Sequence, residues 1–123
     1  MNPDSFGIGV DIEEICRFEK YAKSKDEHFL RRILTESEIE YCFKNKTPAS
    51  HIAARFCAKE AIYKAFCSVG ISNLTFKDVE ILNDKQGIPY ANFLSDKTDG
   101  FICKLSLSHS RSTAVANVVV IKK

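Results

Sequence analysis

The sequence predicts an α+β fold in which a long central helix packs on an antiparallel β-sheet. Residues 47–68 carry the longest helical pattern of the chain, and shorter helical patterns precede it. Strand-like patterns follow it and end in a clear hairpin. Helices first and antiparallel strands afterwards are typical of α+β domains. The length of 123 residues predicts a single domain, residues 1–123.

Composition and cysteine spacing exclude several classes of protein. Hydrophobic residues make up 45% of the chain and charged residues 28%, which is typical of a soluble globular protein. The net charge of +2 is too small to indicate nucleic-acid binding. No signal peptide and no membrane-spanning run is found, so we expect no membrane partner. The odd number and irregular spacing of the cysteines fit neither a disulfide framework nor a zinc site and predict reduced thiols in a cytoplasmic protein; they are Cys16, Cys42, Cys57, Cys67 and Cys103.

The first element is a strand at residues 6–11, because apolar and other residues alternate strictly there. One face is hydrophobic, and the other carries Gly7 and Gly9 and leads to Asp11. Glycine inside a strand often marks a place where another backbone or a ligand comes close. Asp11 is either the N-cap of a helix that begins near Glu13 or a functional carboxylate, and the pattern alone does not choose.

Short helical patterns follow at residues 13–23 and 28–34 and from residue 36 onward. The last opens with a capping box formed by Thr35 and Glu38. Such segments usually carry their charges on a solvated surface. If the basic residues here have a function, they suit an acidic partner better than a nucleic acid, because no nucleic-acid motif accompanies them. These residues are Arg17, Lys20, Lys23, Lys25, Arg31 and Arg32.

The central helix is expected to begin with Thr47 as N-cap and Pro48 at its first position, and to end before Gly70. It has two apolar faces, which is typical of a helix buried inside a protein. Glu60 and Lys64 lie four residues apart; they are either an ordinary surface pair, contributing about 0.3 to 0.5 kcal/mol, or functional charges. The bulky face is Ile52, Phe56, Tyr63 and Phe66, and the small face is Ala54, Ala58, Ala61 and Ala65.

The strand-like patterns after this helix lie at residues 77–82, 88–93, 101–109 and 113–121. Pro89 has to stand at a strand start or edge, because it has no backbone N–H to donate. Residues 118–121 are all apolar, so we expect them to be buried on both faces. His109 ends its strand on the side of that strand's apolar residues. It is either a rim residue or, with Ser108 and Ser110, a phosphate-binding group.

Four groups of residues together resemble the holo-acyl-carrier-protein synthase family, the small bacterial-type 4′-phosphopantetheinyl transferases. The groups are residues 7–12 with 14, 15 and 17; residues 55, 56, 58–61, 64 and 65; residues 83, 84, 87 and 89; and residues 105–110. Their order and spacing match from Gly7 to about Val120. The chain departs from the family at Cys57, where a small residue is usual, and at residues 66–68, where a glycine is common.

The resemblance implies an enzyme of fatty acid biosynthesis that uses coenzyme A as co-substrate. Such an enzyme transfers the 4′-phosphopantetheine group to a serine of apo-acyl carrier protein and releases 3′,5′-ADP. The resemblance further implies that Asp11 and Glu60 bind Mg²⁺ and that Lys64 neutralises phosphate charge, so these three are the expected catalytic residues. The serine proton would go to Glu60 or to a metal-bound water, and this choice stays open.

The resemblance also assigns residues that bind the cofactor and the partner. Arg17 matches the position that binds the carrier protein, and Lys20 and Lys23 are added because they lie near it on the same segment. The residues expected to bind coenzyme A are Arg55, Lys64, Ser108, His109 and Ser110 at its phosphates and Pro89 at its adenine.

The family also implies a homotrimer whose active sites are shared between chains. Such sharing fits the helix geometry, because Arg55 lies about 140° around the helix from Glu60 and one chain can hardly aim both side chains at one ligand. The main alternative function is a non-catalytic oligomeric module that binds nucleotide or carrier protein, but the presence of Asp11, Glu60 and Lys64 argues against it. A weaker alternative is a small RNA-binding domain, and we expect no nucleic-acid partner.

Overall fold

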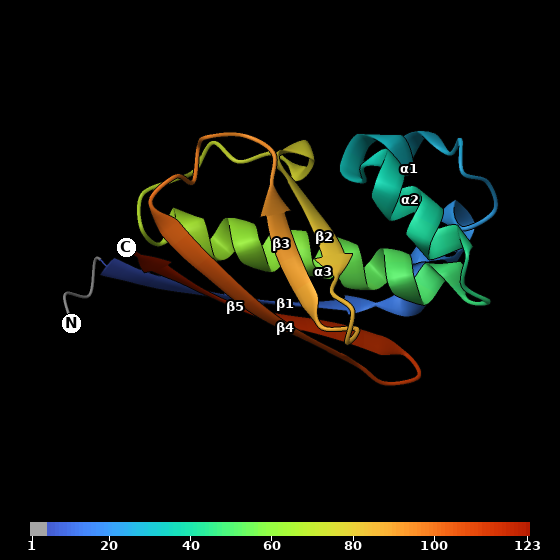
Figure 1. Ribbon diagram of the computed structural model, residues 1–123. Coiled ribbons are helices and arrows are strands. Elements are labelled where there is room, and N and C mark those ends of the chain that lie inside the picture. Colours follow the sequence, from blue (N-terminus) through green and yellow to red (C-terminus); the bar gives the residue numbers. More distant parts are fainter. Residues whose placement is uncertain (1–4) are drawn as a thin grey trace.

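The computed structural model describes residues 5–123 and confirms the α+β class (Figure 1). The elements in chain order are β1 (Phe6–Glu14), the 3-10 helix η2 (Ile15–Tyr21), α1 (His28–Ile33), α2 (Glu36–Phe43), α3 (Pro48–Cys67), the 3-10 turn η3 (Phe76–Asp78), β2 (Val79–Asn83), β3 (Pro89–Phe93), β4 (Phe101–His109) and β5 (Thr113–Lys122). An antiparallel sheet has the order β1-β5-β4, and β2 pairs with β3. The sheet lies along α3, β2 and β3 cross the same helix, and α1 and α2 pack near its N-terminal end (Figure 1).

The close contact between β1 and α3 depends on small residues on both elements. A Cβ built on Gly7 would lie 2.3 Å from the carbonyl oxygen of Ala65, and one on Gly9 would lie 2.0 Å from that of Ala61. Real Cβ atoms never approach carbonyl oxygens so closely, so only glycine allows this strand to lie on the helix. The alanine face of the central helix is therefore confirmed as a place where another backbone approaches, and that backbone is β1.

The first strand is longer than expected, which corrects the predicted helix start. Backbone pairing with β5 continues through Glu14, which lies opposite Thr113, and the 3-10 helix begins only at Ile15. Asp11 lies inside the strand, opposite Ala116, so of the two alternatives left open for it, the helix N-cap is wrong. The neighbouring strand offers the backbone a complete set of partners here, and these outweigh the local capping preference.

Two further expectations are wrong, and one is only partly right. Residues 118–121 are not buried on both faces: Val118 and Val120 are buried, whereas Val119 is 39% exposed, because only one face of the sheet packs on α3. On the bulky face of the central helix, Ile52, Phe56 and Phe66 are buried, but Tyr63 is exposed. Pro48 is the first residue of α3 as predicted, but the Thr47 side chain makes no capping hydrogen bond to the helix backbone.

Other local predictions are confirmed. The capping box of α2 is present, with the Thr35 side chain accepting from the Glu38 amide and the Glu38 side chain accepting from the Thr35 amide. Pro89 is the first residue of β3. Gly87, in the turn before it, has a φ of 83°, which favours glycine. The terminal hairpin joins β4 to β5 as expected.

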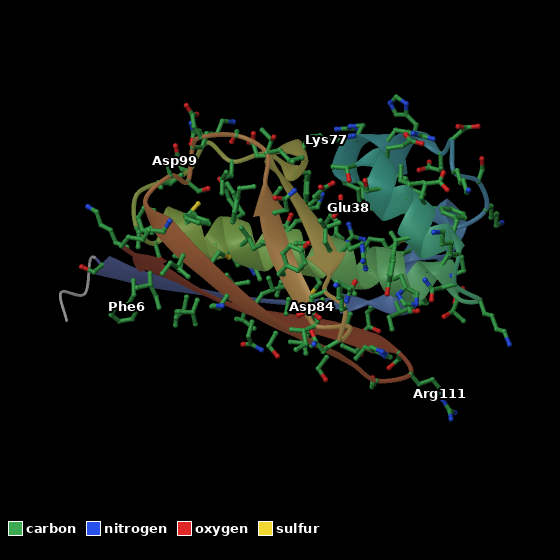
Figure 2. The ribbon with its side chains drawn as sticks, viewed as in Figure 1. Phe6, Glu38, Lys77, Asp84, Asp99 and Arg111 are labelled. Carbon is green, nitrogen blue, oxygen red and sulfur yellow. The ribbon has the colours of Figure 1, made fainter. Side chains whose placement is uncertain are left out.

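One buried ion pair connects three helices to η3 and β2. The Lys59 ammonium on α3 donates to the Glu38 carboxylate of α2 at 2.6 Å, to the Ile33 carbonyl at 2.7 Å and to the Phe76 carbonyl at 2.9 Å. Glu38 also accepts from the backbone amide of Ile81 in β2 at 2.8 Å. Both charged side chains are almost fully buried, and Figure 2 labels Glu38 where α2 meets β2. Their polar atoms are satisfied by each other and by backbone groups, which makes the burial possible.

Replacing Lys59 with methionine keeps an aliphatic side chain but leaves the buried Glu38 carboxylate without its cation. We expect Lys59→Met to lower the free energy of unfolding by about 3 to 5 kcal/mol, measured by urea denaturation. Lys77→Met is the matched control, because Lys77 is an exposed lysine close to the same pair. A loss for Lys59→Met no larger than that of the control would contradict the structural role of the pair.

Candidate functional site

Asp11, Glu60 and Lys64 come together at the contact between β1 and α3. The Lys64 ammonium donates to Asp11 Oδ1 at 3.2 Å and to the Val10 carbonyl at 3.0 Å. Lys64 is therefore paired with a strand residue and does not form the predicted surface pair with Glu60 within residues 5–123. The pKa of Glu60 is raised, first by burial and then by the negative charge of Asp11, so the Asp11 carboxylate lies within electrostatic reach of Glu60.

The same group of residues can accept a divalent cation. The Asp11 side chain is only 11% exposed, and its Oδ2 is buried without a hydrogen-bond partner among the described residues. A buried carboxylate oxygen without a donor, beside a second carboxylate, is a suitable ligand for a metal ion. Mg²⁺ commonly takes one or two carboxylates and fills its other positions with water and substrate phosphate. The residues present therefore fit Mg²⁺.

Glu13 is a further acidic residue at this site that the sequence analysis missed. It lies on the same face of β1 as Asp11, and its Oε1 accepts from Arg17 Nη1 at 2.7 Å. Burial, followed by the neighbouring Asp11 carboxylate, raises the pKa of Glu13 to about 7, and Arg17 opposes the shift. The two-residue spacing from Asp11 was available in the sequence, but the strand was expected to end at Asp11.

Arg55 occupies a separate site, where α3 faces α2 and β2. Its guanidinium donates from Nη2 to Asn83 Oδ1 at 3.1 Å and lies 4.1 Å from the centre of the Tyr41 ring. Arg55 is 4% exposed, and its Nε has no hydrogen-bond partner among the described residues. Pro89 pairs with Asn83 across the β2–β3 turn, so the two residues expected near coenzyme A are brought to one place. A cavity of about 260 Å³ is lined there by Ser37, Tyr41, Arg55, Ile81, Leu82, Asn83 and Tyr90.

The three residues predicted as a phosphate-binding group lie near the β4–β5 turn, where Figure 2 labels Arg111 at the tip. All three are exposed, and Ser108 points to the opposite side of the strand from His109. The Ser110 hydroxyl accepts from the amide of Thr113 at 3.2 Å, so it also stabilises the turn. The pKa of His51 is lowered, first by burial and then by the charges of Arg55 and His109, so His109 and Arg55 both lie within electrostatic reach of His51.

The carboxylate group and the Arg55 group therefore lie on different sides of α3. Lys64 contacts Asp11 of β1, whereas Arg55 contacts Tyr41 of α2 and Asn83 of β2. These contacts agree with the expectation from the sequence that the Arg55 and Glu60 side chains of one chain do not reach the same ligand.

A second, larger cavity opens beside Glu60. Its volume is about 540 Å³, and most of its lining is apolar, because it lies between α3 and the segment that leads to η3. It is lined by Lys59, Glu60, Ile62, Tyr63, Ser72, Asn73, Leu74, Thr75, Phe76 and Val79. The sequence analysis did not predict this cavity, because its walls, residues 59–63 and 72–79, face each other only when the chain turns back after α3.

The basic N-terminal surface is less positive than its composition suggests. Lys25 pairs with Glu40 at 3.1 Å, and Arg31 pairs with Asp26 and Glu36. By contrast, none of the ion pairs found within residues 5–123 includes Lys20 or Lys23. Among the basic residues of this surface, Lys20, Lys23 and Arg32 therefore have no carboxylate partner within residues 5–123.

The outer face of the three-stranded sheet is apolar and exposed. Figure 2 shows Phe6 pointing away from α3, on the face opposite the glycines of β1. Exposed apolar patches of this kind mark interaction sites more often than free surface. The large apolar residues of this face, with their exposed fractions, are Phe6 39%, Ile8 67%, Val10 53%, Ile12 67%, Ile102 42% and Val119 39%. Separately, no helix within the described range has the length and hydrophobicity needed to cross a membrane.

Comparison with known proteins identifies the family. The 4′-phosphopantetheinyl transferase superfamily matches residues 7–118. Holo-[acyl-carrier-protein] synthase from Geobacter sp. (strain M21) is 41% identical over 121 residues, covering 94% of this chain and 97% of the relative. The protein of the same name from Chloroherpeton thalassium is 44% identical over 117 residues, covering 92% and 95%.

Solved structures agree with the sequence relatives. A holo-(acyl-carrier-protein) synthase from Bacillus anthracis str. Ames, in complex with CoA (3′,5′-ADP), has a TM-score of 0.79 and 38% identity, covering 95% of this chain and 96% of that one. The Helicobacter pylori holo-[acyl-carrier-protein] synthase in complex with coenzyme A has a TM-score of 0.76 and 38% identity, covering 94% and 99%. Because sequence and fold match over nearly the whole chain, the protein belongs to the holo-[acyl-carrier-protein] synthase family of the 4′-phosphopantetheinyl transferase superfamily.

Proposed function

We propose that this protein is a Mg²⁺-dependent holo-[acyl-carrier-protein] synthase of fatty acid biosynthesis, acting as a single domain over residues 1–123. The observation that carries the proposal is the buried, unpartnered Oδ2 of Asp11 beside Glu60 and Lys64, in a chain of this family. The free thiols of all five cysteines support a cytoplasmic location.

The reaction joins the arm of coenzyme A to the carrier protein. The serine Oγ of the carrier forms a bond to the phosphorus that bears the pantetheine arm, the bond from that phosphorus to the diphosphate bridging oxygen breaks, and 3′,5′-ADP leaves. Glu60 or a water molecule accepts the serine proton. Such transfers depend mainly on positioning and on neutralising charge at the phosphoryl oxygens.

Asp11 and Glu60 would hold the Mg²⁺, which supplies positive charge to the phosphoryl oxygens when bound. Lys64 supplies a second positive charge; with the cofactor present, its ammonium can turn from Asp11 to a phosphate, because its side chain is half exposed. The apolar cavity beside Glu60 is the proposed place for the pantetheine arm, since it begins at the reacting group and is bounded by Ile62 and Phe76.

The remaining cofactor contacts are proposed to be shared between chains of a homotrimer. Arg55 lines the smaller cavity and Pro89 pairs with Asn83, another of its lining residues, so this place suits the adenosine part of coenzyme A. Ser108, His109 and Ser110 lie on an exposed turn, where they can reach the phosphates of a cofactor bound to a neighbouring chain. The exposed apolar face of the sheet supports this assembly, because a second chain would remove it from water.

The carrier protein is proposed to bind at Arg17, with Lys20 and Lys23 beside it. This surface lies next to the carboxylate group through the Arg17–Glu13 pair. Acyl carrier proteins are acidic, and exposed charges at an interface mainly increase the rate of association and make it sensitive to salt.

The first test is intact-protein mass spectrometry of a bacterial apo-acyl carrier protein incubated with this protein, coenzyme A and Mg²⁺. We expect a gain of about 340 Da on the carrier, the mass of the transferred phosphopantetheine group, and no gain in the presence of EDTA. With the protein folded and several carrier proteins tried, no gain would favour the non-catalytic binding module.

Removing either carboxylate is expected to abolish metal binding and turnover together. Asp11→Asn and Glu60→Gln should each slow the mass gain by about a hundredfold or more, because phosphoryl charge is no longer neutralised. Both should also lose Mn²⁺ binding in electron paramagnetic resonance, while their melting temperatures stay near that of the wild type. Glu14→Gln, on the exposed side of the same strand, is the control. Retained Mn²⁺ binding in either variant would refute the assignment of its residue.

A charge on the apolar sheet face should prevent assembly. We expect the wild type to sediment with about three times its monomer mass of 13.9 kDa and Ile8→Lys to sediment as a monomer, because burying an unpaired ammonium at an interface costs several kcal/mol. Leu94→Lys, at an exposed apolar residue outside this face, is the control and should remain a trimer. A trimeric Ile8→Lys would show that the assembly uses a different surface.

A further inference from the structure

We propose that Glu13 is a positioning residue that holds the Arg17 guanidinium ready for an acidic carrier protein. This inference rests on the proposed function, because it requires that the carrier bind at Arg17. Neither the sequence motifs nor the relatives assign a role to Glu13.

The contacts of Arg17 fix its guanidinium while leaving the side chain accessible. Glu13 Oε1 accepts from Arg17 Nη1 at 2.7 Å, and the guanidinium carbon lies 5.1 Å from the centre of the Phe18 ring and 5.2 Å from that of Phe56. The Arg17 side chain is nevertheless 50% exposed, whereas that of Glu13 is 13% exposed. Within residues 5–123 the bond to Glu13 is the one hydrogen bond of the Arg17 side chain. The Nε and Nη2 donors of Arg17 therefore remain for a carboxylate of a partner.

The backbone around Glu13 is hydrogen-bonded to the neighbouring strand, which distinguishes this pair from an ordinary pair four residues apart on an exposed helix. Glu13 is paired with Ala114 in the sheet, and the next turn is attached by the hydrogen bond from Ile15 N to Ser112 O at 2.9 Å. The strand then turns into η2, which carries Arg17 back over Glu13. Glu14, on the other side of the strand, is exposed and forms none of the ion pairs described here.

The position of Arg17 links docking to the reaction site. Glu13 and Asp11 share one face of β1, and Arg17 lies near enough to Glu60 for its charge to oppose the rise in the pKa of that carboxyl. A carrier carboxylate bound to Arg17 therefore lies beside the carboxylates proposed to hold the metal. An arginine that is already ordered does not lose its side-chain freedom on binding, and its planar guanidinium suits carboxylate recognition.

The test is a double-mutant cycle with Glu13→Ala, Arg17→Ala and the combination, and with Glu14→Ala as matched control. The readouts are the Kd for a fluorescently labelled apo-acyl carrier protein whose acceptor serine is replaced by alanine, and the KM values for carrier and coenzyme A. We expect Glu13→Ala to raise the Kd and the KM for carrier by about three- to tenfold, with the KM for coenzyme A unchanged. Glu14→Ala should match the wild type, and Glu13→Gln should lie between wild type and Glu13→Ala.

The cycle separates positioning from other roles. In the Arg17→Ala background, Glu13→Ala should have no further effect on carrier binding, because its effect acts through Arg17. An equal effect in both backgrounds, an unchanged Kd in Glu13→Ala, or a loss of Mn²⁺ binding with unchanged carrier Kd would each overturn the inference. A wild-type protein that neither binds nor modifies a carrier would instead overturn the proposed function, so the two failures are distinguishable.

Discussion

The buried pair of Lys59 and Glu38 is the interaction on which the arrangement of the other elements depends. It joins α3 to α2 directly, to α1 through the Ile33 carbonyl, and to β2 through the Ile81 amide. Buried charges are tolerated only when paired and hydrogen-bonded, so these elements can pack in few other ways. The cavity at Arg55 depends on this packing, because Tyr41 of α2 and Asn83 of β2 form part of its wall.

A second constraint acts on the opposite side of α3. Glycines in β1 allow the strand to lie directly on the alanine face of the helix, and this contact brings Asp11 close to Glu60 and Lys64. The two constraints use different faces of one helix, and they produce two separate groups of functional side chains. This separation is the reason for proposing that the cofactor is bound between chains, and the exposed apolar sheet face offers a surface for such an assembly.

Charge is nearly balanced where β1 leaves the sheet. Asp11, Glu13 and Glu60 face Arg17 and Lys64, with one carboxylate oxygen left without a donor. The three carboxylates exceed the two cations by one negative charge, so a divalent cation would make the group net positive, which suits the phosphates of a cofactor. Because Arg17 also contacts solvent, the same group of charges connects the reaction site to the surface where a protein substrate arrives.

The sequence by itself determined the fold class, most element positions, the capping box of α2 and the residues of the family motifs, because these depend on local periodicity and spacing. It did not choose between a helix cap and a functional carboxylate for Asp11 and it missed Glu13, since both depend on how far β1 continues beside β5. It was wrong about the burial of Val119, because only one face of the sheet packs on α3. Lys59 belongs to the motif that carries Glu60, yet only the packing shows that it is paired with a residue 21 positions away. Tertiary structure decides such roles, because the free energy of a buried charge depends on partners that are distant along the chain.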